Sequence, residues 1–465
     1  MIQMGALKNI VMNLPEVAGP TQKRLPFKDK IKWTIITLAL FFILGSLSLF
    51  GLDPRSEFRF EQIQVILGAR FGTIISLGIG PIVTASIVLQ LLNGSGILKL
   101  DNKTPEGKAF YQGIQKLLAI AFIFFEAIIY VFMGGLSPDP VRFVGAEFFQ
   151  IQLILIFQLV LGGFLILFMD EVVQKWGIGS GISLFIAAGV SQSLFVRLLS
   201  PVIPQDAEIP VGALPALVQS FVLQRTQDAI MNLARIASTV AVFVVAVYAQ
   251  AMKVEIPLSF GRIRGHGIRW PLNFIYTSNI PVILVAALLA NFQLLAQLLD
   301  GWGRPILGTF VNGAPQSGFI TWVMAPRLMD RILLGTITGM DVLRSLSYLG
   351  FMMAGCVLFS FFWVQTSGMD ARSQAKQIMS SGLQVPGFRK DERVLERLLQ
   401  RYITPLTIMG AMTVGLLAAL ADLSGALANG TGLLLTVMII YRFYEDIAKQ
   451  HMMEMNPAMR KFMGG

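Results

Sequence analysis

Side chains able to do chemistry are few in this chain of 465 residues. Cys356 is the only cysteine, which excludes an intramolecular disulfide and a cysteine-based zinc site. The two histidines, His266 and His451, lie far apart in the sequence, which argues against a histidine metal centre. The phosphate-binding pattern Gly-x-x-x-x-Gly-Lys-[Ser/Thr] does not occur. The sequence therefore predicts a protein that is not an enzyme and needs no cofactor or metal. Any driving force must come from a partner.

One ionisable residue, Glu126, lies within an otherwise apolar stretch, Phe124 to Ile128. A charged group is costly inside a membrane, so such a residue is a functional candidate that faces the interior. The polar side chains that could meet it are Thr84, Gln90 and Asn291. A protonated Glu126 that donates one interhelical hydrogen bond, worth about 1 kcal/mol, is the alternative interpretation.

The elements that must position these residues are membrane-spanning helices. The chain is 54% hydrophobic and only 14% charged, whereas a soluble domain carries about 25% charged residues. A helix needs about 20 apolar residues to cross the hydrocarbon core. Ten segments qualify, and we expect an all-α integral membrane protein. The segments are 33–51, 71–92, 117–133, 149–169, 178–199, 236–252, 274–295, 346–364, 406–423 and 430–444.

The distribution of lysine and arginine predicts the orientation of these spans. Most of the 37 basic residues fall on the side that also carries both termini, and cytosolic loops are enriched in these residues. We therefore expect a multi-pass protein of the cell membrane with both termini in the cytoplasm. The expected parts are a cytosolic segment 1–32, a first half 33–200, an external loop 201–235, a second half 236–448 and a cytosolic tail 449–465. Cytosolic loops are expected at 253–273 and 366–404.

Short sequence echoes suggest that the two halves are related. Ile79-Gly80-Pro81-Ile82-Val83 of the second span resembles Ile280-Pro281-Val282-Ile283 of the seventh. Gly177 to Ile182 in the fifth resembles Gly430 to Leu435 in the tenth. A five-span unit that is repeated inserts inverted the second time, and interrupted helices in matching positions point to the functional pathway. Gly and Pro are also common in membrane helices generally, which is the alternative.

Branched aliphatic residues on these four helices are the candidate lining of that pathway. Residues spaced i, i+4 share a helix face, which places Ile79 with Val83 and Ile178 with Ile182. The alternative is that such residues face lipid or pack within the bundle. The candidate residues are Ile79, Val83, Ile178, Ile182, Ile283 and Leu435.

Two loops carry further hypotheses. The external segment 53–70 contains an amphipathic stretch at 58–67, which either re-enters the bundle, where protein or water surrounds it, or forms a surface loop. The cytosolic loop 366–404 is basic, with helical charge spacing from Arg389 to Arg401. It either binds anionic partners such as rRNA or lipid headgroups or is a solvated loop.

Several motifs in the same order resemble the SecY family of translocation channels along nearly the whole chain. They are Gly78-Ile79-Gly80-Pro81-Ile82-Val83-Thr84, Gln90-Leu91-Leu92, Tyr111-Gln112-Gly113, Gln115-Lys116-Leu117, Gly177 to Ile182, Val254-Glu255-Ile256-Pro257-Leu258, Ser278 to Ile283, Gly387-Phe388-Arg389-Lys390, Gly430-Thr431-Gly432 and Tyr441-Arg442. Their forms look archaeal rather than bacterial.

The resemblance implies an hourglass channel of ten helices in two inverted five-helix halves. The six aliphatic residues above would form its pore ring, and segment 53–70 would be a plug. A lateral gate would lie between spans two and three on one side and spans seven and eight on the other. The implied polar cluster of the gate is Thr84, Gln90, Glu126 and Asn291. The implied plug residues are Phe58, Ile63, Val65, Ile66 and Leu67.

The resemblance also implies the function and the partners. Unfolded secretory polypeptides would cross through the pore, and signal or transmembrane segments would leave sideways into lipid. Ribosomes would dock on the cytosolic loops at Arg262, Arg264, Arg389 and Lys390. Two small single-span subunits, of the SecE/gamma and Sec-beta types, would complete a heterotrimer.

Two other functions are compatible with a polytopic helical chain. A secondary transporter with a five-plus-five inverted repeat needs ion ligands near mid-membrane, where this chain offers isoleucine, glycine and one Glu126. An intramembrane hydrolase needs paired aspartates, a Ser/His pair or a zinc site, and the predicted spans contain none of these.

Overall fold

The computed structural model describes residues 11, 13–22, 25–53, 70–98, 100, 104–203, 208–260, 267–311, 314–380, 383–384 and 391–455. Within them the chain is dominated by helices. In chain order these are α2 (Phe27–Leu44), α4 (Gly80–Gly94), α5 (Pro105–Phe132), α6 (Ala146–Trp176), α7 (Gly181–Leu199), α8 (Ala213–Val222), α9 (Thr226–Ala251), α10 (Ile280–Gly301), α11 (Ile320–Val323), α12 (Leu328–Leu333), α13 (Gly339–Thr366), α14 (Ala371–Ser380), α15 (Glu392–Leu423) and α16 (Gly430–Met455).

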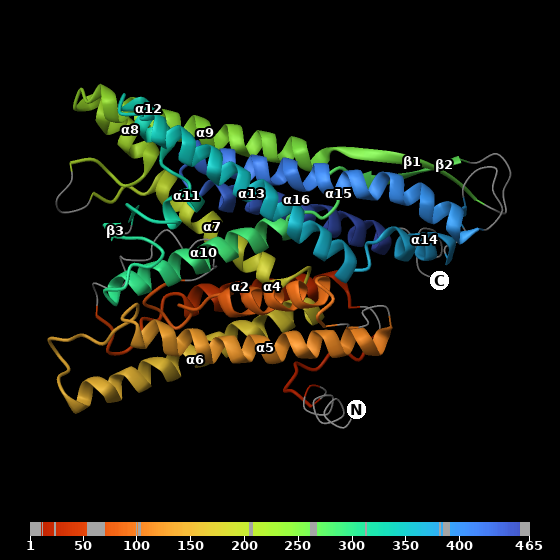
Figure 1. Ribbon diagram of the computed structural model, residues 1–465, viewed down its shortest axis with the longest axis horizontal. Coiled ribbons are helices and arrows are strands. Elements are labelled where there is room, and N and C mark those ends of the chain that lie inside the picture. The colour runs from red at the N-terminus through yellow and green to blue at the C-terminus, as the bar shows by residue number, and fades with distance from the viewer. Residues whose placement is uncertain are drawn as a thin grey trace.

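The long helices run side by side along one direction of the molecule (Figure 1). A strand hairpin and α14 lie at one end, which we name the hairpin end. Helices α8 and α12 lie at the other, which we name the α8 end. Helices α4, α5 and α6 occupy one side of the bundle and α9, α13 and α15 the other, with α7 and α10 between them (Figure 1). The chain therefore forms two helical halves that meet along a central seam.

Each of the ten predicted spans corresponds to one described helix. Seven of these helices are long and apolar enough to cross a membrane by length and composition alone. The other three are α2, α4 and α16. Helix α4 has only 15 residues, and α2 and α16 carry several charged residues near one end. The predominance of long, apolar helices agrees with the prediction of an all-α membrane protein.

The starts of α4 and α10 have the same backbone geometry, 200 positions apart. Gly78 and Ser278 both have positive φ, +53° and +58°. The N–H of Gly78 bonds to the carbonyl of Ile75 at 2.9 Å, and that of Ser278 bonds to the carbonyl of Ile275 at 3.1 Å. A proline follows within the first two positions of each helix. The sequence echo between these segments is therefore also a repeat in local structure, which supports the predicted duplication.

Two predicted spans begin later than the hydropathy suggests. Residues 71–79 form turns, and α4 starts only at Gly80. Likewise α7 starts at Gly181, so Ile178 lies outside the helix and does not share a helix face with Ile182. In the first case Pro81 lacks a backbone N–H and favours the first turn of a helix. In the second, Gly179 has φ +76°, a left-handed conformation that interrupts the chain before the helix.

The predicted cytosolic loops 253–273 and 366–404 pack together at the hairpin end. Strands β1 (Lys253–Phe260) and β2 (Gly267–Asn273) form an antiparallel hairpin, and β5 (Leu383–Gln384) adds to β1. Helix α14 and the start of α15 cover an apolar cluster that includes Ile256, Ile378 and Leu399. The two loops therefore form one structural unit, although their starts at 253 and 366 lie far apart along the chain. The remaining strands, β3 (Phe310–Val311) and β4 (Ala314–Pro315), form a small hairpin between α10 and α11.

Candidate functional site

Two cavities enter the bundle from its opposite ends. The hairpin-end cavity, of about 550 Å³, is lined by α4, α5, α7, α10, α13 and α16. The α8-end cavity, of about 770 Å³, is lined mainly by α2, α7, α10, α16 and the segments around α8 and α12. Four helices, α7, α10, α13 and α16, line both cavities at different heights. The separation between the cavities can therefore be measured along these shared helices.

The partition between the two cavities is thin. On α10, Leu284 lines one cavity and Ala286 the other, a separation of roughly 3 Å along the axis at 1.5 Å per residue. On α7 the corresponding residues are Ser183 and Gly189, roughly 9 Å apart. The cavities therefore approach each other most closely at α10, where buried side chains of the shared helices separate them.

The predicted ring residues lie at or beside this partition. Val83, Ile182 and Ile283 line the inner part of the hairpin-end cavity. Leu435 is buried on α16, one turn from Thr431 in one cavity and one turn from Ile439 in the other. Thus three of the six predicted ring residues line this cavity, and Leu435 lies between the residues of α16 that line the two cavities.

The other two ring residues, Ile79 and Ile178, line neither cavity but are buried close by. Ile79 caps α4, and its carbonyl accepts a hydrogen bond from the N–H of Val83 at 3.0 Å, so those two residues do share a face. Ile178 precedes α7, and its N–H donates to the hydroxyl of Thr34 on α2 at 3.1 Å. Tertiary contact with α2, rather than helical spacing, positions Ile178.

Polar residues that the sequence did not group together line the hairpin-end cavity. Four glutamines from three helices, Gln90, Gln112, Gln115 and Gln174, are on its wall. Gln115 donates to the hydroxyl of Ser86 at 2.6 Å, which ties α5 to α4. Amide side chains both donate and accept hydrogen bonds without carrying charge. The cavity therefore offers a polar wall, on which Lys108, Arg442 and Asp446 are the charged residues, together with aliphatic residues such as Val83 and Ile283.

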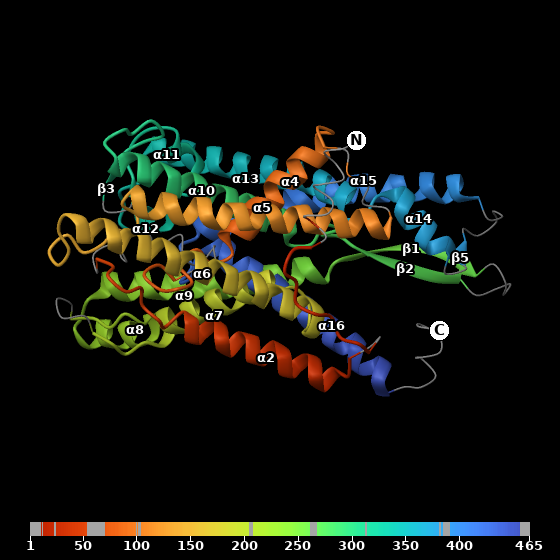
Figure 2. The same cartoon turned by 90° about the horizontal axis from the view of Figure 1, so that it is seen from below.

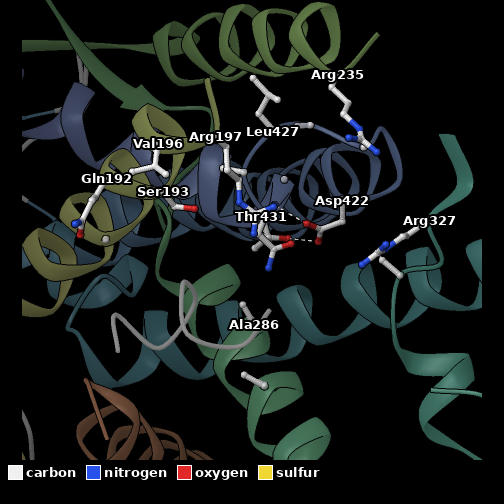
Figure 3. Close-up of a pocket in the computed structure, with 18 of the residues that line it drawn as sticks. Gln192, Ser193, Val196, Arg197, Arg235, Ala286, Arg327, Asp422, Leu427 and Thr431 are labelled. Carbon is white, nitrogen blue, oxygen red and sulfur yellow. Dashed lines mark hydrogen bonds between the residues drawn. The ribbon is translucent and has the colours of Figure 1, made fainter. Parts of the chain in front are cut away.

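The α8-end cavity has a different, basic character. Arg70, Arg197, Arg235 and Arg327 line it together with the acidic Asp330. Arg235 pairs with Asp330 at 3.3 Å, and Arg70 donates to the carbonyl of Gly45 at 3.1 Å. Figure 3 shows Arg197, Arg235 and Arg327 around the floor of this cavity. Their positions in four separate chain segments gave no signal in the sequence.

A polar cluster joins the two halves beside the pathway. The side-chain amide of Asn291 on α10 donates to the hydroxyl oxygen of Thr84 on α4 at 2.9 Å. The same hydroxyl lies 3.4 Å from Oε1 of Glu126 on α5 and 2.8 Å from the carbonyl of Gly80. Thr84 therefore lies between the other two residues: it contacts both Glu126 and Asn291.

Gln90 does not take part in this cluster. It lies almost two turns beyond Thr84 on α4, and its Oε1 has no hydrogen-bond partner among the described residues. Its side chain is buried, yet it borders the hairpin-end cavity. The hydrogen bonds thus separate Gln90 from the three residues with which it was grouped.

The seam between the halves at this cluster is closed by packing. Helix α4 contacts both α10 and α13. At the end of α4, a Cβ added to Gly94 would lie 2.3 Å from the Phe362 ring of α13, so only glycine permits this approach. A second glycine, Gly355 of α13, packs against Val285 of α10. The helices of the predicted gate are thus in contact.

Several predicted site residues lie outside the described residues. They include the plug residues Phe58, Ile63, Val65, Ile66 and Leu67 and the basic residues Arg262, Arg264, Arg389 and Lys390. Among the described residues, three or more metal-ligating side chains do not gather anywhere. Near the hairpin, burial is the main cause that raises the pKa of Tyr276, and the charge of Asp370 adds to it. The Tyr276 hydroxyl donates to the carbonyl of Met369 at 2.7 Å, which ties the sheet to α14.

Comparisons with known proteins agree on one family. The SecY family model matches residues 73–444. The protein translocase subunit SecY of Methanothermobacter thermautotrophicus is 46% identical over 97% of both chains. The SecY subunit of Methanocaldococcus jannaschii is 42% identical over 99% of this chain and all of its own length.

Solved structures show the same fold. A structure described as a protein-conducting channel has a TM-score of 0.81 at 42% identity, with 96% of this chain and 97% of the other covered. Sec61 in a canine ribosome–channel complex from the endoplasmic reticulum has a TM-score of 0.78 at 41% identity and the same coverage. The similarity therefore extends over both helical halves.

Proposed function

The chain belongs to the SecY family, and on that premise we propose that it is the central pore-forming subunit of a protein translocation channel. Unfolded secretory polypeptides pass along the axis of the bundle. Signal and transmembrane segments leave sideways through the seam between α4 and α5 on one side and α10 and α13 on the other.

The single observation that carries this proposal is the pair of opposed cavities separated by an aliphatic layer. The proposed ring of Ile79, Val83, Ile178, Ile182, Ile283 and Leu435 carries no side-chain hydrogen-bonding group or charge. A passing polypeptide therefore finds no specific binding partner at the ring, whatever its sequence. A closed apolar constriction also disfavours water and ions and gates by dewetting. One layer thus supports transport of varied cargo and resists leakage.

Sideways release follows from the chemistry of the seam. A strongly apolar residue gains about 0.3–0.6 kcal/mol on entering the middle of a membrane helix. A segment of sufficient apolar length therefore prefers lipid once the seam parts. The hydrogen bond from Asn291 to Thr84 links the two halves across that seam while the seam is closed. Polar segments remain in the pathway and cross.

We assign the hairpin end to the cytoplasm. The basic stretches of the sequence fall on this side, as expected for a cytosolic face. This orientation places both termini in the cytoplasm and the protein in the cell membrane. It also makes the α8-end cavity the external funnel, which segment 53–70 would close as a plug. Each half, 33–200 and 236–448, then contributes five spans.

The proposed partners are a translating ribosome, signal-bearing nascent polypeptides and two small membrane subunits. Arg262 and Arg264 follow β1, and Arg389 and Lys390 follow β5. Since β1 and β5 are hydrogen-bonded neighbours, one sheet would present both basic pairs to rRNA. The small subunits would add single helices around the bundle. Because the chain is proposed to be a channel and not an enzyme, a partner must supply the driving force.

Site-directed cross-linking tests the pore. Cys356 is fully buried, and Cys356→Ala gives a cysteine-free background with a small change in volume. A cysteine at Ile178 should then form a cross-link to a polypeptide stalled in translocation. A cysteine at Leu420, which is exposed on α15, is the matched control and should not react. Equal cross-linking at both positions would contradict the pore assignment.

The secondary transporter is the remaining alternative, and Glu126 separates the two functions. A transporter that uses Glu126 as its ion or proton ligand should lose solute uptake in Glu126→Gln. A polypeptide channel should retain translocation, because the glutamine side chain can still accept a hydrogen bond from Thr84.

A further inference from the structure

Two aspartates occupy equivalent positions in the two halves and cap the two helices that reach the pathway. Asp170 comes near the end of α6 and accepts the backbone N–H of Ile182 at 3.0 Å, with Gly181 as a second backbone donor. Asp422 comes at the end of α15 and accepts the backbone N–H of Thr431 at 2.7 Å, with Gly430 as a second backbone donor. Each carboxylate thus binds the first turn of the following long helix.

The two caps lie at opposite ends of the pathway, as an inverted repeat requires. The first turn of α7, with Ile182 and Ser183, borders the hairpin-end cavity. The first turn of α16, with Gly430 and Thr431, borders the α8-end cavity, and Figure 3 shows Asp422 bonded to Thr431 there. Each of the two capped helices therefore starts at one of the cavities.

The contacts that hold each carboxylate are specific. Gln174 donates to Oδ2 of Asp170 at 2.8 Å, and Tyr348 of α13 donates to Oδ2 of Asp422 at 2.5 Å. A Cβ added to Gly181 would lie 2.7 Å from Oδ1 of Asp170. A Cβ on Gly181 would also lie 2.6 Å from the Cα of Asp170, and one on Gly430 would lie 2.0 Å from the backbone of Ala421. The glycines at the starts of α7 and α16 therefore permit close approach to the end of the preceding long helix in both halves.

The electrostatic consequence follows from the direction of the two helices. The N-terminus of a helix carries a partial positive charge of about half an elementary charge, and such ends attract anions. Without the aspartates, one positive helix end would face each cavity on either side of the apolar partition. In the α8-end cavity this charge would add to Arg197, Arg235 and Arg327.

We propose that Asp170 and Asp422 are an inverted pair of positioning residues for the pathway. Each fixes the first turn of a helix that carries ring residues, and each cancels the positive end that this helix turns toward a cavity. The proposal rests on the channel function above, since it concerns the electrostatic potential along the pathway of that channel.

The test measures the local potential with thiol reagents of opposite charge. Ser183→Cys reports the potential near Asp170, and Asn429→Cys reports the potential near Asp422. Both cysteines are introduced into the full-length Cys356→Ala protein in lipid vesicles. The ratio of the labelling rates of an anionic and a cationic methanethiosulfonate reagent is then compared with and without Asp170→Asn or Asp422→Asn. Asparagine keeps the size and one acceptor oxygen but removes the charge.

We expect each substitution to raise the anionic-to-cationic rate ratio at its own cavity by about two- to tenfold. The rise should shrink with added salt, since exposed charges are screened. Asp139→Asn and Asp300→Asn are matched controls. Each of these carboxylates also accepts a backbone N–H, from Val141 and Phe310 respectively, but neither the carboxylates nor their partners line either of the two cavities, so the rate ratios should stay unchanged. An unchanged ratio for both aspartate variants, or an equal rise in the controls, would overturn the electrostatic part of the proposal.

Gly181→Ala tests the positioning part without removing a charge, and it also serves if Asp170→Asn reduces folding. Its methyl group would overlap both the Cα and Oδ1 of Asp170 and so force the first turn of α7 away from that carboxylate. A cysteine at Ile182 should therefore become severalfold more reactive to a neutral reagent. Unchanged reactivity would overturn the positioning role of Asp170. Translocation by the cysteine-free parent is measured separately, so a failure of the channel function is distinguishable from a failure of this proposal.

Discussion

The amide of Asn291 and the hydroxyl of Thr84 form a hydrogen bond of 2.9 Å between α10 and α4, which belong to different halves of the protein. Thr84 can donate its single hydroxyl proton to the carbonyl of Gly80 at 2.8 Å while it accepts from Asn291. The bond from Asn291 therefore does not compete with the hydrogen bond that Thr84 makes within its own helix. It is a direct polar link across the seam through which apolar segments are proposed to leave.

Loss of this link should make the seam easier to open. Thr84→Val keeps the side-chain shape and leaves the Asn291 amide without its acceptor when the seam is closed. Interhelical hydrogen bonds in membranes are worth about 1 kcal/mol, which is about a fivefold shift in the gate equilibrium. We therefore expect the Thr84→Val channel to translocate substrates whose signal segments are too weakly apolar to open the seam of the unmodified channel.

The matched control is Thr413→Val, because the Thr413 hydroxyl donates to Met409 within its own helix α15. Thr413→Val should not change the hydropathy threshold, which is the lowest hydropathy of a signal segment that still supports translocation. A threshold that is the same in both variants and the parent would show that the link does not hold the gate.

The contact between Gly94 and Phe362 should behave as a coupled pair. Gly94→Val places side-chain atoms where the Phe362 ring lies, and overpacking of this kind costs about 1–3 kcal/mol. We expect a lower Tm in detergent, with part of the loss restored by adding Phe362→Ala. Non-additivity of about 0.5–3 kcal/mol is typical of residues in contact.

Gly350→Val on α13 is the control for this pair, because no atom lies within 4 Å of a Cβ built there. Its effect on Tm should be independent of Phe362→Ala. If Gly94→Val and Phe362→Ala also prove additive, the two residues do not form the predicted contact.

A polar group in the ring should open the partition to ions. Ile283 lines the floor of the hairpin-end cavity on α10, where the partition is thinnest. Ile283→Asn offers water a hydrogen-bonding site there, so the dewetting barrier should fall and ion leak through reconstituted channels should rise severalfold. Leu295→Asn, at an exposed position on the same helix, should not change the current. Equal currents from both variants would count against a ring at this height.

The segment before α2 is tied to α6 by an ion pair that should respond to acid. The Lys175 ammonium hydrogen-bonds Glu16 and lowers the pKa of that carboxyl below its ordinary value of 4.5. A carboxyl with a lowered folded pKa stabilises the fold above its unfolded pKa, and this stabilisation is lost as the pH falls through the lower folded value. The tie should therefore hold above about pH 4.5 and weaken only below it.

The fluorescence of Trp176 reports this tie, because its indole N–H donates to the carbonyl of Ala18 at 2.9 Å. We expect a small spectral shift below pH 4.5, because Glu16 is largely exposed and its ion pair is screened. In Lys175→Met the transition should move up toward pH 4.5. A transition that stays in place would mean that another group controls the segment.

The spans and the family could be predicted from local patterns. Each predicted span depended on a run of about 20 apolar residues, and such a run has one stable solution in lipid. The grouping of Thr84, Glu126 and Asn291 came from the resemblance, and the hydrogen bonds agree with it. The inclusion of Gln90 and the helical spacing of Ile178 with Ile182 did not agree with the structure. Gln90 lies almost two turns beyond Thr84 on α4 and borders the hairpin-end cavity. Gly179 has a left-handed backbone conformation, so α7 begins after it and Ile178 lies outside the helix.

The sequence by itself determined the helical membrane fold and the family, because hydropathy and motif order are properties of short segments. It offered the duplication and the aliphatic ring as hypotheses. Only the tertiary structure decided how closely the two cavities approach each other. It also decided that Asp170 and Asp422 cap the helices of the pathway, and that four arginines meet in one cavity. The reason is physical: each of these features joins residues from separate helices or from across a turn, and their distances depend on how whole helices pack.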